Sequence, residues 1–187
     1  MSDDEEMILD DDDVDVEDED VDVEDDASGD VEDGDDDAKS DGSEVDISNT
    51  YYTAKGSIED DIDEALESFE TILDMEEEKG QWGFKSLKQM VKALFKIEKY
   101  SEMLKRYKQL LEYMSIVTRN ESETAINKVL NMVSSSTDQK LLANVYTETL
   151  EALKKASNEK LWFNTKLKQG KLYMDAQDYD ALQKVIN

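Results

Sequence analysis

The chain has 187 residues, no cysteine and no histidine, and its 21 basic and 49 acidic side chains give a net charge of −28. The missing residue types exclude disulfide scaffolds, zinc sites built on cysteine or histidine, thiol nucleophiles and histidine-based acid–base catalysis. The acidic start lacks a basic patch followed by an apolar run, so we expect no secretory signal. The sequence contains no run of about 18 apolar residues, so we expect no membrane span.

Charge divides the chain into two parts. Residues 1–46 hold 26 acids and one base, whereas residues 47–187 hold 23 acids and 20 bases. The first part has too few apolar side chains to offset the entropy of ordering, and its carboxylates repel one another. We therefore predict a disordered acidic tail over 1–46 and a helical-repeat domain over 47–187. The tail fits two interpretations: a solvating extension, or a lure for a basic partner such as histones or the chain's own basic face.

The second part reads as helical throughout. It contains no proline, and its apolar residues recur with the period of an α-helix. The pattern predicts helices at about 59–78, 82–98, 101–115, 121–134, 138–156, 159–175 and 178–187. Connections this short place consecutive helices antiparallel to one another.

A weak internal repeat runs through these helices. Leucines recur at Leu66, Leu104, Leu142 and Leu182, in steps of 38, 38 and 40 residues, and each step holds two predicted helices. This period favours an all-α fold, specifically a right-handed helix-pair solenoid of tetratricopeptide-like type, over an irregular bundle. Because the pattern stops within a helix pair, we expect a domain truncated at its C-terminus, or one that docks on a partner there.

Basic residues concentrate in the predicted second and third helices. Residues 79–119 hold ten bases and three acids, and five lysines in this segment follow steps of three and four residues: Lys85, Lys88, Lys92, Lys96 and Lys99. Such spacing places them along one side of the second predicted helix, opposite an apolar side. The stripe is either a solvated face or an anion-binding surface for an acidic protein or a polyphosphate. Nucleic acid fits least, because the chain is strongly acidic and no base-stacking motif accompanies the lysines.

No set of residues resembles an active site. The many carboxylates do not single out a pair suited to acid–base catalysis, and the Gly80 to Gly83 segment lacks the strand–turn–helix context of a phosphate loop. The aromatic residues fall at helix-packing positions. We therefore expect a non-catalytic protein without a metal or a cofactor.

Several strings resemble the N-terminal region of the second-subunit family of the COP9 signalosome. They lie at 49–55, 78–92, 106–111, 117–123, 149–154, 161–163 and 170–173, and the acidic tail before the Tyr51–Tyr52 pair is also similar. The related proteasome-lid subunit has the same layout, but the Trp82-Gly83-Phe84-Lys85 string favours the signalosome.

The resemblance implies a scaffold whose helical-repeat arm docks cullin–RING ubiquitin ligases, while another subunit removes the ubiquitin-like protein Nedd8. It implies contacts with other signalosome subunits, the cullin C-terminal region and the RING protein, in nucleus and cytoplasm, with no membrane or nucleic-acid partner. Basic residues of the family's arm contact the ligase and an inositol polyphosphate, and Lys85, Lys88 and Arg106 match those strings. Family members also continue into a C-terminal PCI domain, which the 187 residues do not include.

Two other functions remain open at this point. An acidic-tailed module resembling a histone chaperone or transcription cofactor would work through residues 1–46. A proteasome-lid subunit would share the helical layout but assemble into a different complex.

Overall fold

The computed structural model describes residues 42–186, and every regular element among them is helical. The α-helices are α1 (Gly42–Ser57), α2 (Ile62–Met75), α3 (Gln81–Lys96), α4 (Tyr100–Glu112), α5 (Arg119–Ser134), α6 (Gln139–Lys155), α7 (Glu159–Asp175) and α8 (Tyr179–Ile186). A short 3-10 turn, η1 (Tyr113–Ser115), follows α4. The all-α prediction is confirmed.

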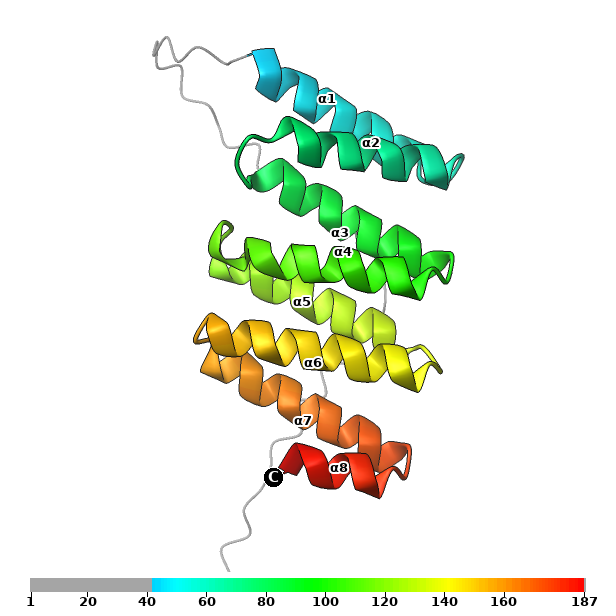
Figure 1. Ribbon diagram of the computed structural model, residues 1–187, viewed down its shortest axis with the longest axis vertical. Coiled ribbons are helices and arrows are strands. Elements are labelled where there is room, and N and C mark those ends of the chain that lie inside the picture. Colours follow the sequence, from blue (N-terminus) through cyan, green and yellow to red (C-terminus); the bar gives the residue numbers. More distant parts are fainter. Residues whose placement is uncertain (1–41, 187) are drawn as a thin grey trace, which may run out of the picture. The chain divides into compact units, whose positions relative to one another are not determined.

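The helices stack in sequence order, each packed against the next along most of the chain (Figure 1). Some alternate helices also contact each other: α1 packs on α3, α3 on α5, and α4 on α6. We call α1, α3, α5 and α7 the odd layer, and α2, α4, α6 and α8 the even layer. The four repeat leucines all lie on even-layer helices, so one sequence period corresponds to one helix pair. The solenoid prediction is confirmed, while its tetratricopeptide-like character and its handedness stay predictions.

The sequence prediction located seven of the helices and missed α1. This helix begins at Gly42 and crosses the predicted boundary between the tail and the domain at residues 46 and 47. Ile47, Tyr51 and Ala54 are its buried residues, and the Tyr51 ring lies 5.8 Å from Phe69 of α2 and 5.4 Å from Trp82 of α3. Tertiary contacts therefore hold α1 in place. The disordered tail stays a prediction, because residues 1–41 lie outside the described residues.

Side chains that cap the helix N-termini explain several of the boundaries. In α5, Thr118 and Glu121 form a reciprocal capping box, in which each side chain accepts from the backbone N–H of the other. Asp138 caps α6 and Asn158 caps α7, each through a side-chain oxygen that accepts from a backbone N–H of the first turn. These short polar side chains satisfy backbone donors that a helix start leaves unpaired.

Three helices end without glycine in a turn that normally favours it. Glu98, Ser157 and Gln177 follow α3, α6 and α7 with φ of 59°, 53° and 57°, in the left-handed region. Each turn closes with a backbone bond from the next residue to a carbonyl five residues earlier, such as Lys99 N–H to the Leu94 carbonyl at 3.0 Å. This is the Schellman arrangement, and it turns the chain sharply into the next helix.

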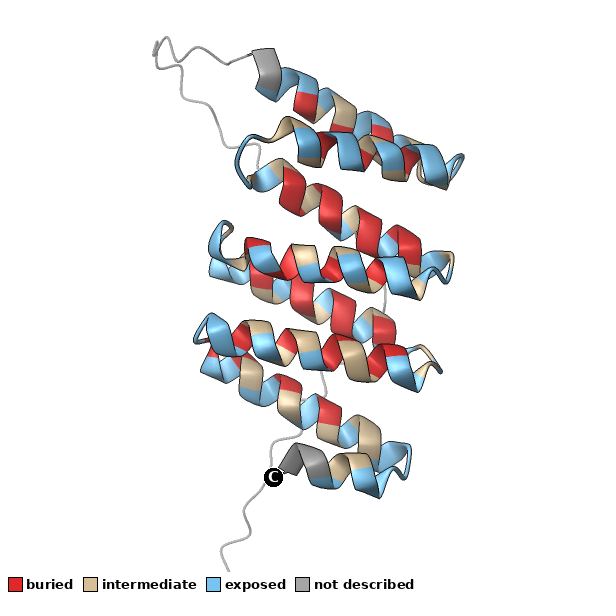
Figure 2. Ribbon diagram, viewed as in Figure 1, coloured by how far each residue is buried: buried red, intermediate tan, exposed pale blue. Residues whose placement is uncertain are grey.

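The core runs between the two layers, and half of the residues of α3 are buried (Figure 2). Tyr107 of α4 is fully buried, and its hydroxyl lies 2.7 Å from the Thr149 hydroxyl of α6. Thr149 also donates to the Val145 carbonyl, so both buried hydroxyls are satisfied. Burial raises the pKa of the Tyr107 hydroxyl, which stays protonated.

Candidate functional site

The exposed side of α3 is the site that the lysine spacing predicts. Eight residues of this helix are buried, and the exposed ones are Gln81, Lys88, Lys92 and Lys96. Lys85 is half-buried at the edge of the same side. We call Lys85, Lys88, Lys92 and Lys96 the lysine row. Four ammonium groups therefore share one side of a helix whose opposite side is anchored in the core.

The loop before α3 sets the position of this row. Gly80, at the N-cap, has no side chain to cap the helix, and the Glu76 carboxylate accepts instead from the Gly80 N–H at 3.1 Å and the Gly83 N–H at 2.9 Å. A Cβ at Gly83 would lie 2.7 Å from the Tyr113 hydroxyl and would also collide with the Glu76 carboxylate. Glu76 is also the C-cap of α2, so one residue ends α2 and holds the start of α3.

Two lysines of the row lie over aromatic rings. The Lys85 Nζ is 4.9 Å from the Trp82 ring centre, and the Lys88 Nζ is 5.1 Å from the Phe84 ring centre. An aromatic face attracts an ammonium group while leaving its outer side open to a ligand. Trp82 is half-buried, although we expected it on the buried side, and its ring also contacts the exposed Tyr52 of α1 at 6.1 Å. The row thus begins at an aromatic edge that spacing alone did not indicate.

The other end of the row is free of carboxylate partners. Within residues 42–186, no ion pair or hydrogen bond involves the ammonium groups of Lys92 and Lys96, and both side chains are exposed. Neighbouring like charges on a helix destabilise it by ~0.2–0.5 kcal/mol per pair. A bound polyanion would relieve this repulsion, so the row is suited chemically to bind carboxylates or phosphates.

Lys99 lies off this row. Helix α3 ends at Lys96, and the left-handed Glu98 redirects the chain before Lys99, which is the N-cap of α4. The Lys99 Nζ pairs with the Asp63 carboxylate of α2 at 3.2 Å. The prediction of five lysines along one helix side is therefore wrong for the last of them, because α3 ends at Lys96, three residues before Lys99.

Arg106 also lies away from the row. Its guanidinium pairs with Glu70 of α2 and donates to the Gln109 amide oxygen at 3.1 Å. Both Arg106 and Lys99 line a groove shared by α2, α3 and α4, to which α3 contributes Met90 and Leu94 from its buried side. Desolvation lowers the pKa of Arg106, which remains a cation at neutral pH. The structure thus separates the six predicted site residues into a row of four and a groove pair.

One acid of α5, Glu121, lies next to the row, and the sequence pattern did not predict it there. The Glu121 carboxylate accepts from the Gln81 amide at 2.9 Å, and a hydrogen bond from Thr118 is the largest of the effects that lower its pKa. Lys88 adds a smaller electrostatic contribution in the same direction. The Thr118-x-x-Glu121 spacing, a capping-box signature, is the sequence signal that could have located this neighbour.

A polar cluster joins α5 to α7 further along the odd layer. Arg119 donates to Glu123 at 2.7 Å and to the Asn158 amide oxygen at 2.7 Å, and the Asn158 amide donates to Glu123 at 2.8 Å. The bond from Arg119 is the largest cause of the lowered pKa of Glu123. Thr118, two residues before Asn120, is the N-cap of α5, and Glu123 belongs to this cluster.

The described residues show neither a metal-binding cluster nor a membrane-spanning helix. In the described part of the chain, no three acidic side chains converge as metal ligands would. No helix between residues 42 and 186 combines the length and the apolar character needed to cross a membrane.

The chain is similar in sequence to curated proteins that share one name. The chain is 50% identical over 145 residues to "COP9 signalosome complex subunit 2" of Drosophila melanogaster, covering 76% of this chain and 33% of that protein. It is 49% identical over 145 residues to the protein of that name from Caenorhabditis elegans, covering 76% and 29%. For the Dictyostelium discoideum protein the identity is 41% over 154 residues, covering 80% and 34%. No protein-family model matches the chain.

These matches extend well beyond the short strings that first indicated the resemblance. The chain spans about a third of the length of the curated relatives it matches. Over roughly three quarters of its own length, this chain is therefore related to part of COP9 signalosome complex subunit 2.

Proposed function

We propose that this chain is the ligase-docking arm of a COP9 signalosome subunit, a scaffold that does no chemistry itself. One comparison supports the proposal: the relatives of this chain carry the name of a signalosome subunit. In this proposal the arm assembles with other signalosome subunits in nucleus and cytoplasm. It holds a cullin–RING ligase while a different subunit removes Nedd8.

The lysine row is the observation that carries the docking proposal. Lys92 and Lys96 keep exposed ammonium groups without a carboxylate partner among the described residues, and the helix that bears them is anchored along its opposite side. Helix anchoring matters, because a binding group already held in place loses little entropy when the partner arrives. An acidic surface of the ligase fits this row, with an inositol polyphosphate as a further ligand that could bridge the two proteins.

Docking through lysines should depend on the salt concentration. Exposed charges attract an opposite surface over roughly 10 Å at 0.1 M salt, and they raise the rate of encounter more than the final affinity. Ligase binding through the row should therefore weaken as salt rises. In this proposal the groove pair, Lys99 and Arg106, contributes to stability, because both cations already have carboxylate partners.

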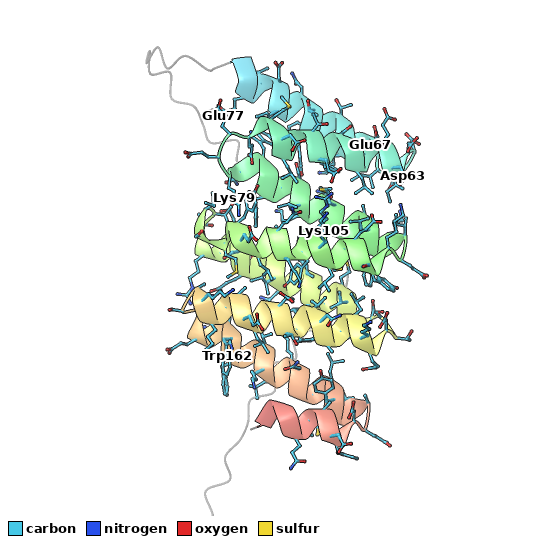
Figure 3. All side chains as sticks on the ribbon, viewed as in Figure 1. Asp63, Glu67, Glu77, Lys79, Lys105 and Trp162 are labelled. Carbon is cyan, nitrogen blue, oxygen red and sulfur yellow. The ribbon has the colours of Figure 1, made fainter. Side chains whose placement is uncertain are left out.

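Titration of a purified cullin–RING ligase onto the full chain tests this proposal. The test variant carries Lys85→Glu and Lys92→Glu on the odd layer. A matched control carries Lys105→Glu and Lys140→Glu, which reverse two exposed lysines of the even layer (Lys105 is labelled in Figure 3). We expect the test variant to lose at least about tenfold in affinity, or ~1.4 kcal/mol, with a weaker salt dependence. Equal losses in the two variants, or unchanged binding in the test variant, would contradict docking through the row.

A further inference from the structure

Two ion pairs lie in the groove of α2, α3 and α4 at matching positions. Asp63 of α2 pairs with Lys99 at 3.2 Å, and Glu70 of α2 pairs with Arg106 of α4. The partners are 36 residues apart in each pair, so α2 and α4 keep one register over this stretch. The two pairs are separated by seven residues on either side of the groove, which is about 10 Å along a helix.

Between the two ion pairs, each side of the groove carries a carboxylate. Glu67 lies on α2 between the two acids of the pairs, and Glu102 lies on the α4 side between the two cations. Both side chains are exposed, and no ion pair or hydrogen bond involves either carboxylate within residues 42–186. We call this stretch, with Glu67 and Glu102, the acidic gap. Like charges meet in the gap, whereas opposite charges are paired on both sides of it.

Apolar side chains line the groove beneath these charges. Leu66 of α2 is partly buried there, and Met90 and Leu94 of α3 are buried. The groove has a volume of about 380 Å³, which is enough room for one long side chain. Lys105 follows Glu102 by three residues on α4 but does not line the groove (Figure 3 labels Lys105). The acidic gap therefore offers two carboxylates above an apolar surface, and the two cations that line the groove are already paired.

We propose that the acidic gap binds an arginine side chain from a basic segment of a partner protein. The aliphatic stem of the arginine packs on the apolar side chains of the groove, and its planar guanidinium donates to both carboxylates.

The charge around the gap favours a basic partner. Residues 59–78, which include α2, hold 11 acids and no base, and such a surface attracts a basic segment from a distance. A hard metal ion fits less well, because it takes six or more oxygen ligands and the gap has only two free carboxylates. This inference does not depend on the ligase-docking role of the lysine row, which lies on the odd layer.

Methyl NMR of the full chain, labelled with carbon-13 at its methionine methyl groups, tests the proposal. Met90 lines the groove, so its methyl resonance reports whether the groove is occupied, while Met1 and Met7 report binding to the acidic residues 1–46. The main probe is a blocked tripeptide with arginine between two glycines. Its analogue with citrulline keeps the shape of the side chain and lacks the charge. Spermidine and calcium chloride are the other two probes.

Two variants separate the acidic gap from the overall charge. The test variant carries Glu67→Gln and Glu102→Gln. The matched control carries Glu77→Gln and Glu78→Gln, which remove two exposed carboxylates outside the groove (Glu77 is labelled in Figure 3). Circular dichroism checks that each variant keeps its helices.

We expect the arginine peptide to shift the Met90 methyl resonance to saturation, and to bind the test variant at least about tenfold more weakly. The control variant should bind as the wild type does, and the citrulline peptide should bind at least about tenfold more weakly than the arginine peptide.

Equal losses in the two variants would reduce the effect to overall charge, and equal binding of the two peptides would exclude a cationic occupant; either result overturns the proposal. A shift confined to Met1 and Met7 would overturn the groove as the site. A saturable Met90 shift with spermidine or calcium, and none with the arginine peptide, would assign the gap to a polyamine or a metal ion, against the proposal.

Discussion

Lys92 and Arg106 carry the same charge and lie on consecutive helices, yet the structure gives them opposite surroundings. Lys92 is exposed on the odd layer without a carboxylate partner in the described chain. Arg106 lines the groove of α2, α3 and α4, where it pairs with Glu70. One cation is available to a partner molecule, and the other joins two helices of the same domain.

The difference shows that local charge density does not identify a binding surface. Both residues come from one basic segment, residues 79–119, with ten bases and three acids. The acidic segment before it, residues 59–78, holds 11 acids and no base, and α2 carries several of them to the groove. Folding therefore neutralises Lys99 and Arg106, which face α2, and leaves Lys92 and Lys96 without a carboxylate partner among residues 42–186. The following predictions test that separation, from the largest expected effect to the smallest.

The anchor of α3 should be the most sensitive point. Gly83→Ala places a methyl group against the Glu76 carboxylate and the Tyr113 hydroxyl, so the bonds that cap α3 must shift. We expect a loss of ~1–3 kcal/mol in the free energy of unfolding, measured by urea denaturation. Gly56→Ala is the control, because nothing lies within 4 Å of its added methyl group. It should leave stability unchanged or raise it, and an equal loss in both variants would contradict this role for Gly83.

Removing one cation from each region tests the comparison itself. Arg106→Gln breaks the pair with Glu70 in a partly buried groove, and we expect it to cost about 0.5–1 kcal/mol of stability. Lys92→Gln removes an exposed cation that has no carboxylate partner in the described part of the chain, so its effect on the free energy of unfolding should lie near zero. Thermal denaturation of the two variants measures both values. A larger loss for Lys92→Gln would reverse the roles that we assign.

The turn after α3 should be more stable with glycine at position 98, because its left-handed geometry favours glycine. Glu98 has a φ of 59°, and glycine adopts this conformation without the steric cost of a side chain. We expect Glu98→Gly to raise stability by roughly 0.5–1 kcal/mol in thermal unfolding and to leave ligase binding unchanged. Glu102→Gly, inside α4, is the control and should lower stability by about 1 kcal/mol. Destabilisation by Glu98→Gly would contradict the turn's role in placing Lys99.

The α5–α7 cluster should give a small pH dependence. The pKa of Glu123 is lowered in the fold, mainly by its bond from Arg119, so its stabilisation is present above the usual carboxyl pKa and disappears as pH falls through the lowered value. Glu123→Gln should therefore melt below the wild type at neutral pH, and the two melting temperatures should converge in acid. A constant gap from pH 7 to about pH 3 would contradict this assignment.

Much of the fold follows from periodic apolar positions, which predicted α2 to α8 within a few residues. The segment that forms α1 lacks such a signal, because it is rich in serine, threonine and tyrosine and buries only Ile47, Tyr51 and Ala54. Its stability depends on rings from α2 and α3, which no local pattern reveals. Tertiary contacts here decide whether a weak helix forms.

The candidate site was predictable in part for the same reason. Spacing alone placed Lys85, Lys88, Lys92 and Lys96 together, since helical geometry fixes which residues share a side. It could not show that α3 ends at Lys96, because Glu98 rather than glycine makes the left-handed turn. It also could not show that Glu70 of a different helix would pair with Arg106.

Lysine acetylation measured by mass spectrometry, on the full chain alone and with a bound cullin–RING ligase, tests the central claim most directly. If the lysine row is the docking surface, the ligase should protect Lys85, Lys92 and Lys96 by several-fold, while Lys105 on the even layer keeps its reactivity. Protection of Lys105 with unchanged reactivity at Lys92 and Lys96 would place the ligase on the opposite layer and contradict the account.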